Sequence, residues 1–271
     1  MVAPLRTFDM LVPKDAGGVQ IASGISYGAA PRQKLDLYAP RRTRPDKPIP
    51  IIIFFYGGSW ASGFRQGYDF VGRALAAQGF LVVIPDYRIG PDNLYPDFVA
   101  DGAQVVRWMV AHGAAYGGVT RRIVVSGHSA GAYIAAMVAL DSRWLGKDRT
   151  MIRGFVGIAG PYDFTPFDVP ASIAAFGRWP RPEETQPVTW AGKGAPPTLL
   201  LVGDADETVR PHNSVALAAK LQAADVPVTV RRYAAIGHVG MVTAVARPFR
   251  FRAPVVADLA RFVRSVTAKP D

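Results

Sequence analysis

Cysteine is absent from the 271-residue sequence. This absence excludes a disulfide framework, a thiolate zinc site and a cysteine nucleophile. Long apolar runs are missing as well: residues 132–140 are typical of the longest, whereas a membrane-spanning helix needs about 20 residues. The first residues, Met-Val-Ala-Pro-Leu-Arg, lack the pattern of a secretory leader. We therefore expect a soluble, cytoplasmic protein without a membrane span.

Acidic residues are few relative to basic ones, 21 against 31, which gives a formal net charge of +10. Such an excess is found in proteins that bind nucleic acid or anionic surfaces. Here the arginines are scattered, and aromatic and basic residues are not interleaved as in single-strand binders. We interpret the charge as a basic surface and expect no nucleic-acid partner. The densest basic cluster lies among prolines and predicts a solvated loop; it comprises Arg41, Arg42, Arg44 and Lys47.

Hydrophobic residues make up 49% of the chain, which is enough for a sizeable core in a single domain over residues 1–271. Residues 20–27 and 34–38 alternate polar and apolar side chains, which suits outer antiparallel strands. The run PIIIFF at 50–55 is typical of a strand buried on both faces of a sheet. The further predicted strands are residues 80–84, 122–126, 155–159, 198–202 and 228–233.

Helical spacing separates these strands, and Gly79 is a suitable stop for the first helix. The predicted helices are residues 68–78, 97–112, 130–140, 213–224 and 255–266. This alternation predicts an α/β fold with a mostly parallel central sheet flanked by helices. Residues 161–197 are rich in Pro, Phe and Trp with weak periodicity, and we interpret them as a short cap-like insertion within the same domain.

The clearest catalytic motif is Gly-His-Ser-Ala-Gly at residues 127–131. It follows a predicted buried strand and leads directly into a predicted helix, which is the strand–turn–helix context that a G-x-S-x-G nucleophile requires. Small neighbours suit the tight turn, and the helix N-terminus favours an oxyanion there. Ser129 is therefore the candidate nucleophile.

A glycine-rich loop, Tyr-Gly-Gly-Ser-Trp at residues 56–60, follows the third predicted strand. A tetrahedral intermediate needs main-chain N–H donors near its oxygen, and glycine lets the backbone come close. In chain order the loop occupies the place of an HGGG-type oxyanion motif. We assign the N–H groups of Gly58, Ser59 and Ala130 as the oxyanion donors.

The chain has four histidines, and one must act as the base that activates a serine hydroxyl. His238 follows the last predicted strand, in a loop, as the Ser…Asp…His order requires. His128 is expected to point away from Ser129, His112 ends a helix, and His212 precedes one or rims the site.

The orienting carboxylate is expected after strand 198–202, where the sequence offers Asp204, Asp206 and Glu207. Asp206 is our choice, although the logic of a catalytic triad alone does not separate it from Asp204.

Besides the motifs of the nucleophile, the oxyanion loop, the base and the acid, further short motifs occur along nearly the whole chain. They are Leu35-Asp36-Leu37-Tyr38-Ala39-Pro40, Asp86-Tyr87-Arg88 with Tyr95-Pro96 and Asp101, Gly160-Pro161-Tyr162-Asp163, and Gly203-x-x-Asp206-x-x-Val209. With these, the chain resembles the α/β-hydrolase superfamily, in particular carboxylesterases of the hormone-sensitive-lipase-like group and of the bacterial feruloyl-esterase and kynurenine-formamidase-like groups. The resemblance implies an α/β-hydrolase fold, places the acid at Asp206, and gives the Asp86 stretch a role at the base of the site.

One position departs from these families: Tyr56 stands where they usually have histidine before the two glycines. Its hydroxyl is expected either to replace the imidazole hydrogen bond or to line the substrate pocket. Aromatic residues of the loop and the insertion are further candidates for an apolar pocket, and about half are expected to be ordinary packing. These are Trp60, Phe64, Tyr162, Phe164, Phe167, Phe176, Trp179 and Trp190.

Together these residues predict a serine hydrolase that cleaves small to medium carboxylic esters through an acyl-enzyme. A small ester is the expected partner, without a metal ion or organic cofactor, and the oligomeric state is left open. Two alternatives stay open: an arylformamidase-like amidase with the same machinery, and a catalytically silent ligand-binding homologue. The complete Ser, Asp and His set argues against the silent homologue.

Overall fold

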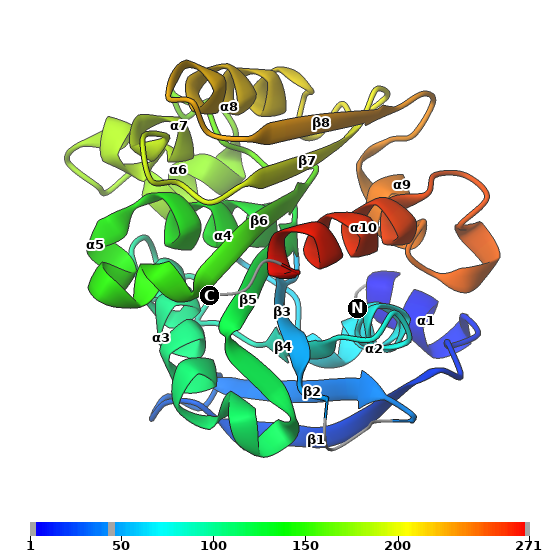
Figure 1. Cartoon of the computed structure of the whole chain (residues 1–271). Coiled ribbons are helices and arrows are strands. Elements are labelled where there is room, and N and C mark those ends of the chain that lie inside the picture. Colours follow the sequence, from blue (N-terminus) through cyan, green and yellow to red (C-terminus); the bar gives the residue numbers. More distant parts are fainter. Residues whose placement is uncertain (1–3, 43–46, 269–271) are drawn as a thin grey trace.

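Within residues 4–42 and 47–268, which the computed structural model describes, eight strands form one central sheet (Figure 1). Its order is β1-β2-β4-β3-β5-β6-β7-β8. The pairs β1–β2 and β2–β4 are antiparallel, and the remaining pairs are parallel. The strands are β1 (Gly18–Ser26), β2 (Lys34–Pro40), β3 (Ile49–Phe55), β4 (Leu81–Pro85), β5 (Gly118–His128), β6 (Ile152–Ile158), β7 (Thr198–Gly203) and β8 (Val228–Tyr233). The mostly parallel sheet expected from the sequence is confirmed. Arg44 of the predicted basic loop lies outside the described residues.

Burial along the strands follows their place in the sheet. Strands β4 and β7 are buried at every position, as are the last five residues of β3, because helices cover both faces of a parallel sheet. The edge strands β1 and β8 carry exposed side chains. Strand β5 begins at Gly118, earlier than the expected start at residue 122. The sequence did not predict these first residues because most are partly exposed and lack the apolar pattern of the buried end of the strand.

Helices pack on both faces of the sheet (Figure 1). Helices α2 and α10 contact each other on one face, and α3, α4 and α8 lie on the other. Every residue of α4 is buried, which explains its uniformly apolar sequence. These five helices lie where helical spacing was expected. Their bounds are α2 (Asp69–Ala76), α3 (Asp97–His112), α4 (Ala130–Leu140), α8 (His212–Ala223) and α10 (Val255–Thr267).

The remaining helices were not expected, because most are too short to show a helical period. They are α1 (Pro4–Leu11), α5 (Ser142–Leu145), α6 (Pro170–Phe176), α7 (Pro187–Trp190) and α9 (His238–Thr243). Five 3₁₀ turns within the described chain connect the larger elements: η1 (Arg65–Tyr68), η2 (Gly113–Tyr116), η3 (Gly146–Met151), η4 (Pro182–Thr185) and η5 (Arg247–Phe249). None of the helices in this described part is both long and apolar enough to cross a bilayer.

The segment 161–197 contains α6, η4 and α7. Its Phe176 packs against Trp60 and Tyr133, with ring centroids 4.8 and 5.2 Å apart. The segment is therefore joined to the sheet domain through aromatic contacts. Its role as a cap, and the assignment of the chain to one domain, stay predictions.

Strand register brings the candidate loops together at one edge of the sheet. Phe55 pairs with Gly127 and Gly203 pairs with Tyr233, so neighbouring parallel strands end at the same level. The loops that follow β3, β5, β7 and β8 consequently meet beyond the carboxyl ends of the strands, where open α/β sheets bind their ligands.

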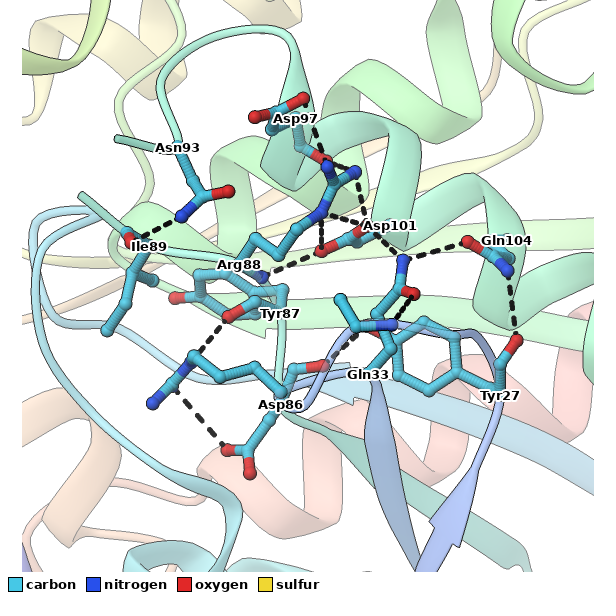
Figure 2. A network of polar contacts seen from close by, with 12 residues as sticks. Tyr27, Gln33, Asp86, Tyr87, Arg88, Ile89, Asn93, Asp97, Asp101 and Gln104 are labelled. Atoms are coloured by element: carbon cyan, nitrogen blue, oxygen red, sulfur yellow. Dashed lines mark hydrogen bonds and ion pairs between the residues drawn. The ribbon is translucent and has the colours of Figure 1, made fainter. Parts of the chain in front are cut away.

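A polar network ties the β1–β2 turn and the end of β4 to helix α3 (Figure 2). The Arg88 guanidinium donates to the fully buried carboxylate of Asp101, with Nη2 2.8 Å from Oδ1. Gln33 Nε2 donates to the same oxygen at 2.8 Å. The Tyr27 hydroxyl donates to the main-chain oxygen of Asp86 at 2.6 Å. The network therefore fixes the chain directly after β4, which lies beneath the candidate site.

Arg88 offers a matched test, because a second aspartate on α3 also contacts it. Asp97 lies 3.3 Å from Arg88 and its side chain is 36% exposed, whereas that of Asp101 is 0% exposed. We expect Asp101→Ala to lower the free energy of unfolding by about 3 kcal/mol, because Arg88 and Gln33 would lose the buried carboxylate to which they donate. Asp97→Ala should cost less than about 1 kcal/mol, as solvated ion pairs do. Urea unfolding of both variants checks this, and equal losses would contradict it.

Candidate active site

The turn at Ser129 joins β5 to α4 and has no room for side chains at its glycines. Ser129 has φ 55° and ψ −127°, a strained backbone for a residue with a side chain. A Cβ on Gly131 would lie 2.1 Å from the main-chain oxygen of Phe55, and one on Gly127 would lie 2.4 Å from the carbonyl carbon of Gly131. Glycine at both positions therefore lets β5 turn into α4 directly against β3, and the serine stands at the N-terminus of the buried helix.

Ser129, His238 and Asp206 form one continuous hydrogen-bonded chain. His238 Nε2 lies 2.8 Å from Ser129 Oγ, and His238 Nδ1 lies 2.8 Å from Asp206 Oδ2. The other Asp206 oxygen accepts from the main-chain N–H groups of Thr208 and Val209 at 3.0 and 2.8 Å. Both carboxylate oxygens are thus occupied, and the imidazole is fixed between an acid and a hydroxyl.

The alternative acids lie elsewhere. Asp204 is exposed and forms an ion pair with Arg232, 2.7 Å between Oδ1 and Nε. Glu207 is exposed at the wall of a pocket. The structure therefore places Asp206, and not its two neighbours, beside the imidazole.

His238 begins helix α9, with Gly237 as the N-cap, and does not sit within a loop as expected. The loop from β8 to α9 is held against the loop that follows β7: Ala205 N donates to the Ile236 oxygen at 3.1 Å. A Cβ on Gly203 would lie 2.2 Å from that same oxygen. This close approach sets the distance between the acid and the base.

His128 has a structural contact that the sequence did not reveal. Its Nε2 lies 3.1 Å from the main-chain oxygen of His238, and the two imidazole centroids are 4.8 Å apart. A carbonyl oxygen only accepts, so Nε2 carries the proton. Burial, together with nearby His238, lowers the pKa of His128 to about 3. A neutral His128 therefore positions the backbone of His238.

The other two histidines play no part in this chain of hydrogen bonds. His112 ends α3 and stacks on Trp108, with ring centroids 4.6 Å apart. His212 begins α8 and lines a pocket beside Ser129, which agrees with a place at the rim of the site.

The oxyanion loop lies directly against the nucleophile. A Cβ on Gly57 would lie 3.0 Å from Ser129 Cβ. Gly58, Ser59 and Trp60 follow with φ angles of 140°, 54° and 58°, and the Gly58 oxygen accepts from the N–H groups of residues 61 and 62. This run of left-handed residues makes a tight turn whose backbone lies beside Ser129. The assignment of Gly58, Ser59 and Ala130 as oxyanion donors stays a prediction.

Tyr56 is fully buried and holds this loop from beneath. Its hydroxyl donates to Asp86 Oδ1 at 2.8 Å and accepts from Arg32 at 2.8 Å. Arg32 also donates to the Gly63 oxygen at 2.8 Å, and Arg65 N donates to Asp86 Oδ1 at 2.7 Å. Burial raises the pKa of Tyr56 well above its ordinary value, so the hydroxyl keeps its proton. Both ends of the loop are therefore attached to one carboxylate.

Two pockets lined by described residues flank Ser129. The α6-side pocket, about 380 Å³, is lined by Trp60, Ala130, Phe164 and Ala171 among others. The α1-side pocket, about 450 Å³, is lined by residues from α1, the oxyanion loop and α9. Ser129 borders both, so a group bound at the serine can extend in two directions.

Of the four predicted substrate contacts, two lie at a pocket. Trp60 and Phe164 line the α6-side pocket. Tyr56 and Tyr162 are fully buried instead: the first supports the oxyanion loop, and the second packs its hydroxyl end against Gly157 and Gly160. Tyr56 therefore follows the first of its two expected alternatives, a supporting hydrogen bond, and does not line a pocket. Tyr162 packs in the interior, where a substrate contact was expected. Within the described residues, no group of three or more His, Asp or Glu side chains is placed to hold a metal ion.

The fold and the arrangement of Ser129, His238 and Asp206 are those of the α/β hydrolases that use a Ser-His-Asp triad. Esterase B from Lactobacillus rhamnosis, solved with a tributyrin phosphonate inhibitor, superposes with a TM-score of 0.83 at 19% identity, over 97% of this chain and 91% of that one. At this identity the likeness shows the fold. The chain also matches the BD-FAE family over residues 35–221, and it belongs to that family.

Curated relatives match over shorter stretches. A probable isoprenylcysteine alpha-carbonyl methylesterase, ICME, of Oryza sativa subsp. japonica is 34% identical over 151 residues, which are 53% of this chain and 36% of that protein. Esterase LipC of Mycobacterium tuberculosis is 32% identical over 205 residues, 67% of this chain and 50% of that protein. The matches thus span half or less of the length of these relatives.

The buried His128 predicts a pH dependence of stability. Its pKa falls from 6.5 to about 3 on folding, so the unfolded chain binds the proton more readily. Stability is then full above pH 6.5 and declines as the pH falls toward 3, by roughly 1.4 kcal/mol per pH unit from this group. We expect the slope to be reduced in His128→Gln and unchanged in His112→Gln, an exposed histidine. Urea unfolding across this pH range measures both slopes, and identical slopes for the two variants would disprove the assignment.

Proposed function

We propose that the protein is a serine hydrolase that cleaves small to medium carboxylic esters through an acyl-enzyme. The observation that carries the proposal is the hydrogen-bonded chain Ser129–His238–Asp206, with 2.8 Å at each step, beside a left-handed loop that offers main-chain N–H groups. An alcohol becomes a useful nucleophile when a base takes its proton, and this arrangement supplies both the base and its orienting acid.

The steps follow from the geometry. His238 Nε2 takes the proton of Ser129 as the oxygen attacks the ester carbonyl, and Asp206 stabilises the imidazolium that forms. The N–H groups of Gly58, Ser59 and Ala130 bind the oxyanion. The C–O bond to the alcohol breaks as His238 returns the proton to the leaving oxygen. Water then repeats the sequence on the acyl-enzyme and releases the acid.

The relatives support ester bonds as the target. The curated relatives include proteins described as an esterase and as a methylesterase. The two pockets beside Ser129, about 380 and 450 Å³, are at the small end of ligand sites. These volumes favour esters with short or medium groups on either side of the carbonyl.

Covalent labelling tests the nucleophile. We expect a fluorophosphonate probe to label the wild-type protein and Ser126→Ala, but not Ser129→Ala. Ser126 is the matched control, because it lies fully buried on β5, three residues before Ser129. Turnover of p-nitrophenyl acetate should fall more than about 1000-fold in Ser129→Ala, as removal of a triad serine does elsewhere.

A folded wild-type protein that resists the probe would contradict the proposal and favour a silent ligand-binding homologue. Turnover of N-formylkynurenine well above that of every p-nitrophenyl ester would instead favour the amidase alternative.

The support of the oxyanion loop has its own test. Tyr56→Phe removes the hydroxyl that joins Asp86 and Arg32, so the loop loses an attachment while the pocket walls stay in place. We expect kcat for p-nitrophenyl acetate to fall roughly tenfold with little change in KM, because the loop donors act in the transition state. Tyr38→Phe is the control: Tyr38 is equally buried, and its hydroxyl has no hydrogen-bond partner among the described residues. A rise in KM with kcat unchanged would refute the role of Tyr56 in supporting the oxyanion loop. An equal effect of Tyr56→Phe and Tyr38→Phe would refute it as well.

A further inference from the structure

We propose that helix α1 builds the pocket for the leaving alcohol, and that this pocket selects esters of bulky apolar alcohols. The inference rests on the proposed esterase function. Each of the two pockets then binds one part of the ester, the acyl group or the alcohol, and the enzyme favours one class of alcohol.

The position of His238 decides the direction of the leaving group. The alcohol oxygen must receive its proton from His238 Nε2, so it has to lie within hydrogen-bond reach of that atom when the C–O bond breaks. His238 lines the α1-side pocket, together with Gly57, Gly58 and Ser129. The described residues that line the α6-side pocket include Ala130 but not His238. The alcohol therefore extends into the α1-side pocket, and the acyl group into the α6-side pocket.

The walls of the α1-side pocket are apolar and aromatic. Leu5 and Phe8 of α1 face Phe64 and Tyr68 across it. Leu5, Phe8 and Phe64 are half-buried, so each has apolar surface left for a ligand to cover. Burial of a ligand's apolar surface there is favourable at about 25 cal/mol per Å². An aromatic or branched alkyl alcohol is the group that these walls fit.

The packing of α1 makes this wall firm. Phe8 contacts Phe70 of α2 and Phe249 of η5, with ring centroids 5.3 and 5.7 Å apart. Phe70 N donates to the buried Asp9 carboxylate at 2.8 Å. At the rim, the Arg6 guanidinium lies 5.5 Å from the centroid of the Phe64 ring, within the range of a cation–π contact. Helix α1 is thus fixed to the body of the protein beside the serine.

The opposite pocket differs in chemistry. Its lining combines apolar side chains such as Trp60 and Phe164 with a set of charged and polar ones, Asp163, Asp168, Glu207, Arg210 and His212. Charged side chains do not favour an apolar group, whose burial would desolvate them. A bulky apolar alcohol is therefore directed to the α1 side by the chemistry of both pockets.

Part of the alcohol pocket lies outside the stretch that matches the family. The family match covers residues 35–221, so α1 and the α9 residues Val239 and Thr243, which also line the pocket, lie outside it. The part shared with the family match is the wall from the oxyanion loop to Tyr68, together with His128, Ser129 and Thr208. Helix α6 lines one pocket and α1 the other; in the view of Figure 1, α6 lies at the upper left and α1 at the right.

The test compares two ester series with one variable group each. Methyl, cyclohexylmethyl and benzyl acetate vary the alcohol, and methyl acetate, butyrate and hexanoate vary the acyl group. We expect the wild-type kcat/KM for benzyl and cyclohexylmethyl acetate to exceed that for methyl acetate by about tenfold or more. Leu5→Ala removes apolar contact and Leu5→Trp fills the pocket, so each should lower this alcohol ratio about fivefold. Neither variant should change the acyl ratio, which is kcat/KM for methyl hexanoate divided by that for methyl acetate.

The controls come from the same helix and from the other pocket. Leu11→Ala makes the same chemical change on α1 at a side chain that is 78% exposed, and should leave both ratios unchanged. Ala171→Trp, in the α6-side pocket, should lower the hexanoate-to-acetate ratio and leave the alcohol ratio unchanged. Leu5 variants that alter only the acyl ratio, or neither ratio, would overturn the assignment of the pockets. Absence of turnover for every ester, with no probe labelling of Ser129, would instead overturn the proposed function itself.

Discussion

Close backbone contact beneath Ser129 is the constraint on which the rest of the site depends. Gly57, Gly127 and Gly131 meet there without room for a side chain, and a Cβ on Gly131 would come within 2.1 Å of the Phe55 oxygen. Because β3 and β5 end at the same level, the loop after one strand lies against the turn after the other. The nucleophile and its neighbouring amides are consequently placed by the main chain, and main-chain positions move little compared with side-chain rotamers.

The second requirement is that the loop after β3 stays in this position. The carboxylate of Asp86 serves this purpose by accepting from Tyr56 and from the main chain of Arg65. Arg88, two residues further along, is fastened to α3 through Asp101 (Figure 2). The segment 86–88 therefore joins the oxyanion loop on one side to the helical layer on the other. Tyrosine at position 56 fits this arrangement because its neutral hydroxyl both donates to a carboxylate and accepts from an arginine.

Much of the fold could be predicted from the sequence, because buried parallel strands and long helices leave strong local patterns. Ser129 could also be predicted as the nucleophile, because its motif is five consecutive residues between a predicted strand and a predicted helix. Other features depend on contacts between distant segments. Asp204 and Asp206 are two residues apart on one loop, and the logic of a triad does not separate them. The family resemblance favours Asp206, and the structure places that carboxylate beside His238. The direction in which Tyr56 points, and the contact of His128 with the backbone of His238, likewise arise from packing. Helix α1 has only eight residues, which are too few to show its role in the sequence. That role follows from packing against Phe70 and Phe249 and from the pocket that α1 shares with Phe64.

The attachment of α1 also bears on how the site is divided between parts of the chain. Its eight residues stand before the sheet begins and are joined to α2 chiefly through Asp9 and Phe8. Ser129, Asp206 and His238 instead follow strands β5, β7 and β8. A substitution in α1 would alter one wall of the pocket beside Ser129 without changing a residue of the hydrogen-bonded chain. Under the proposed assignment, the selection of the alcohol and the cleavage of the bond thus depend on separate parts of the structure.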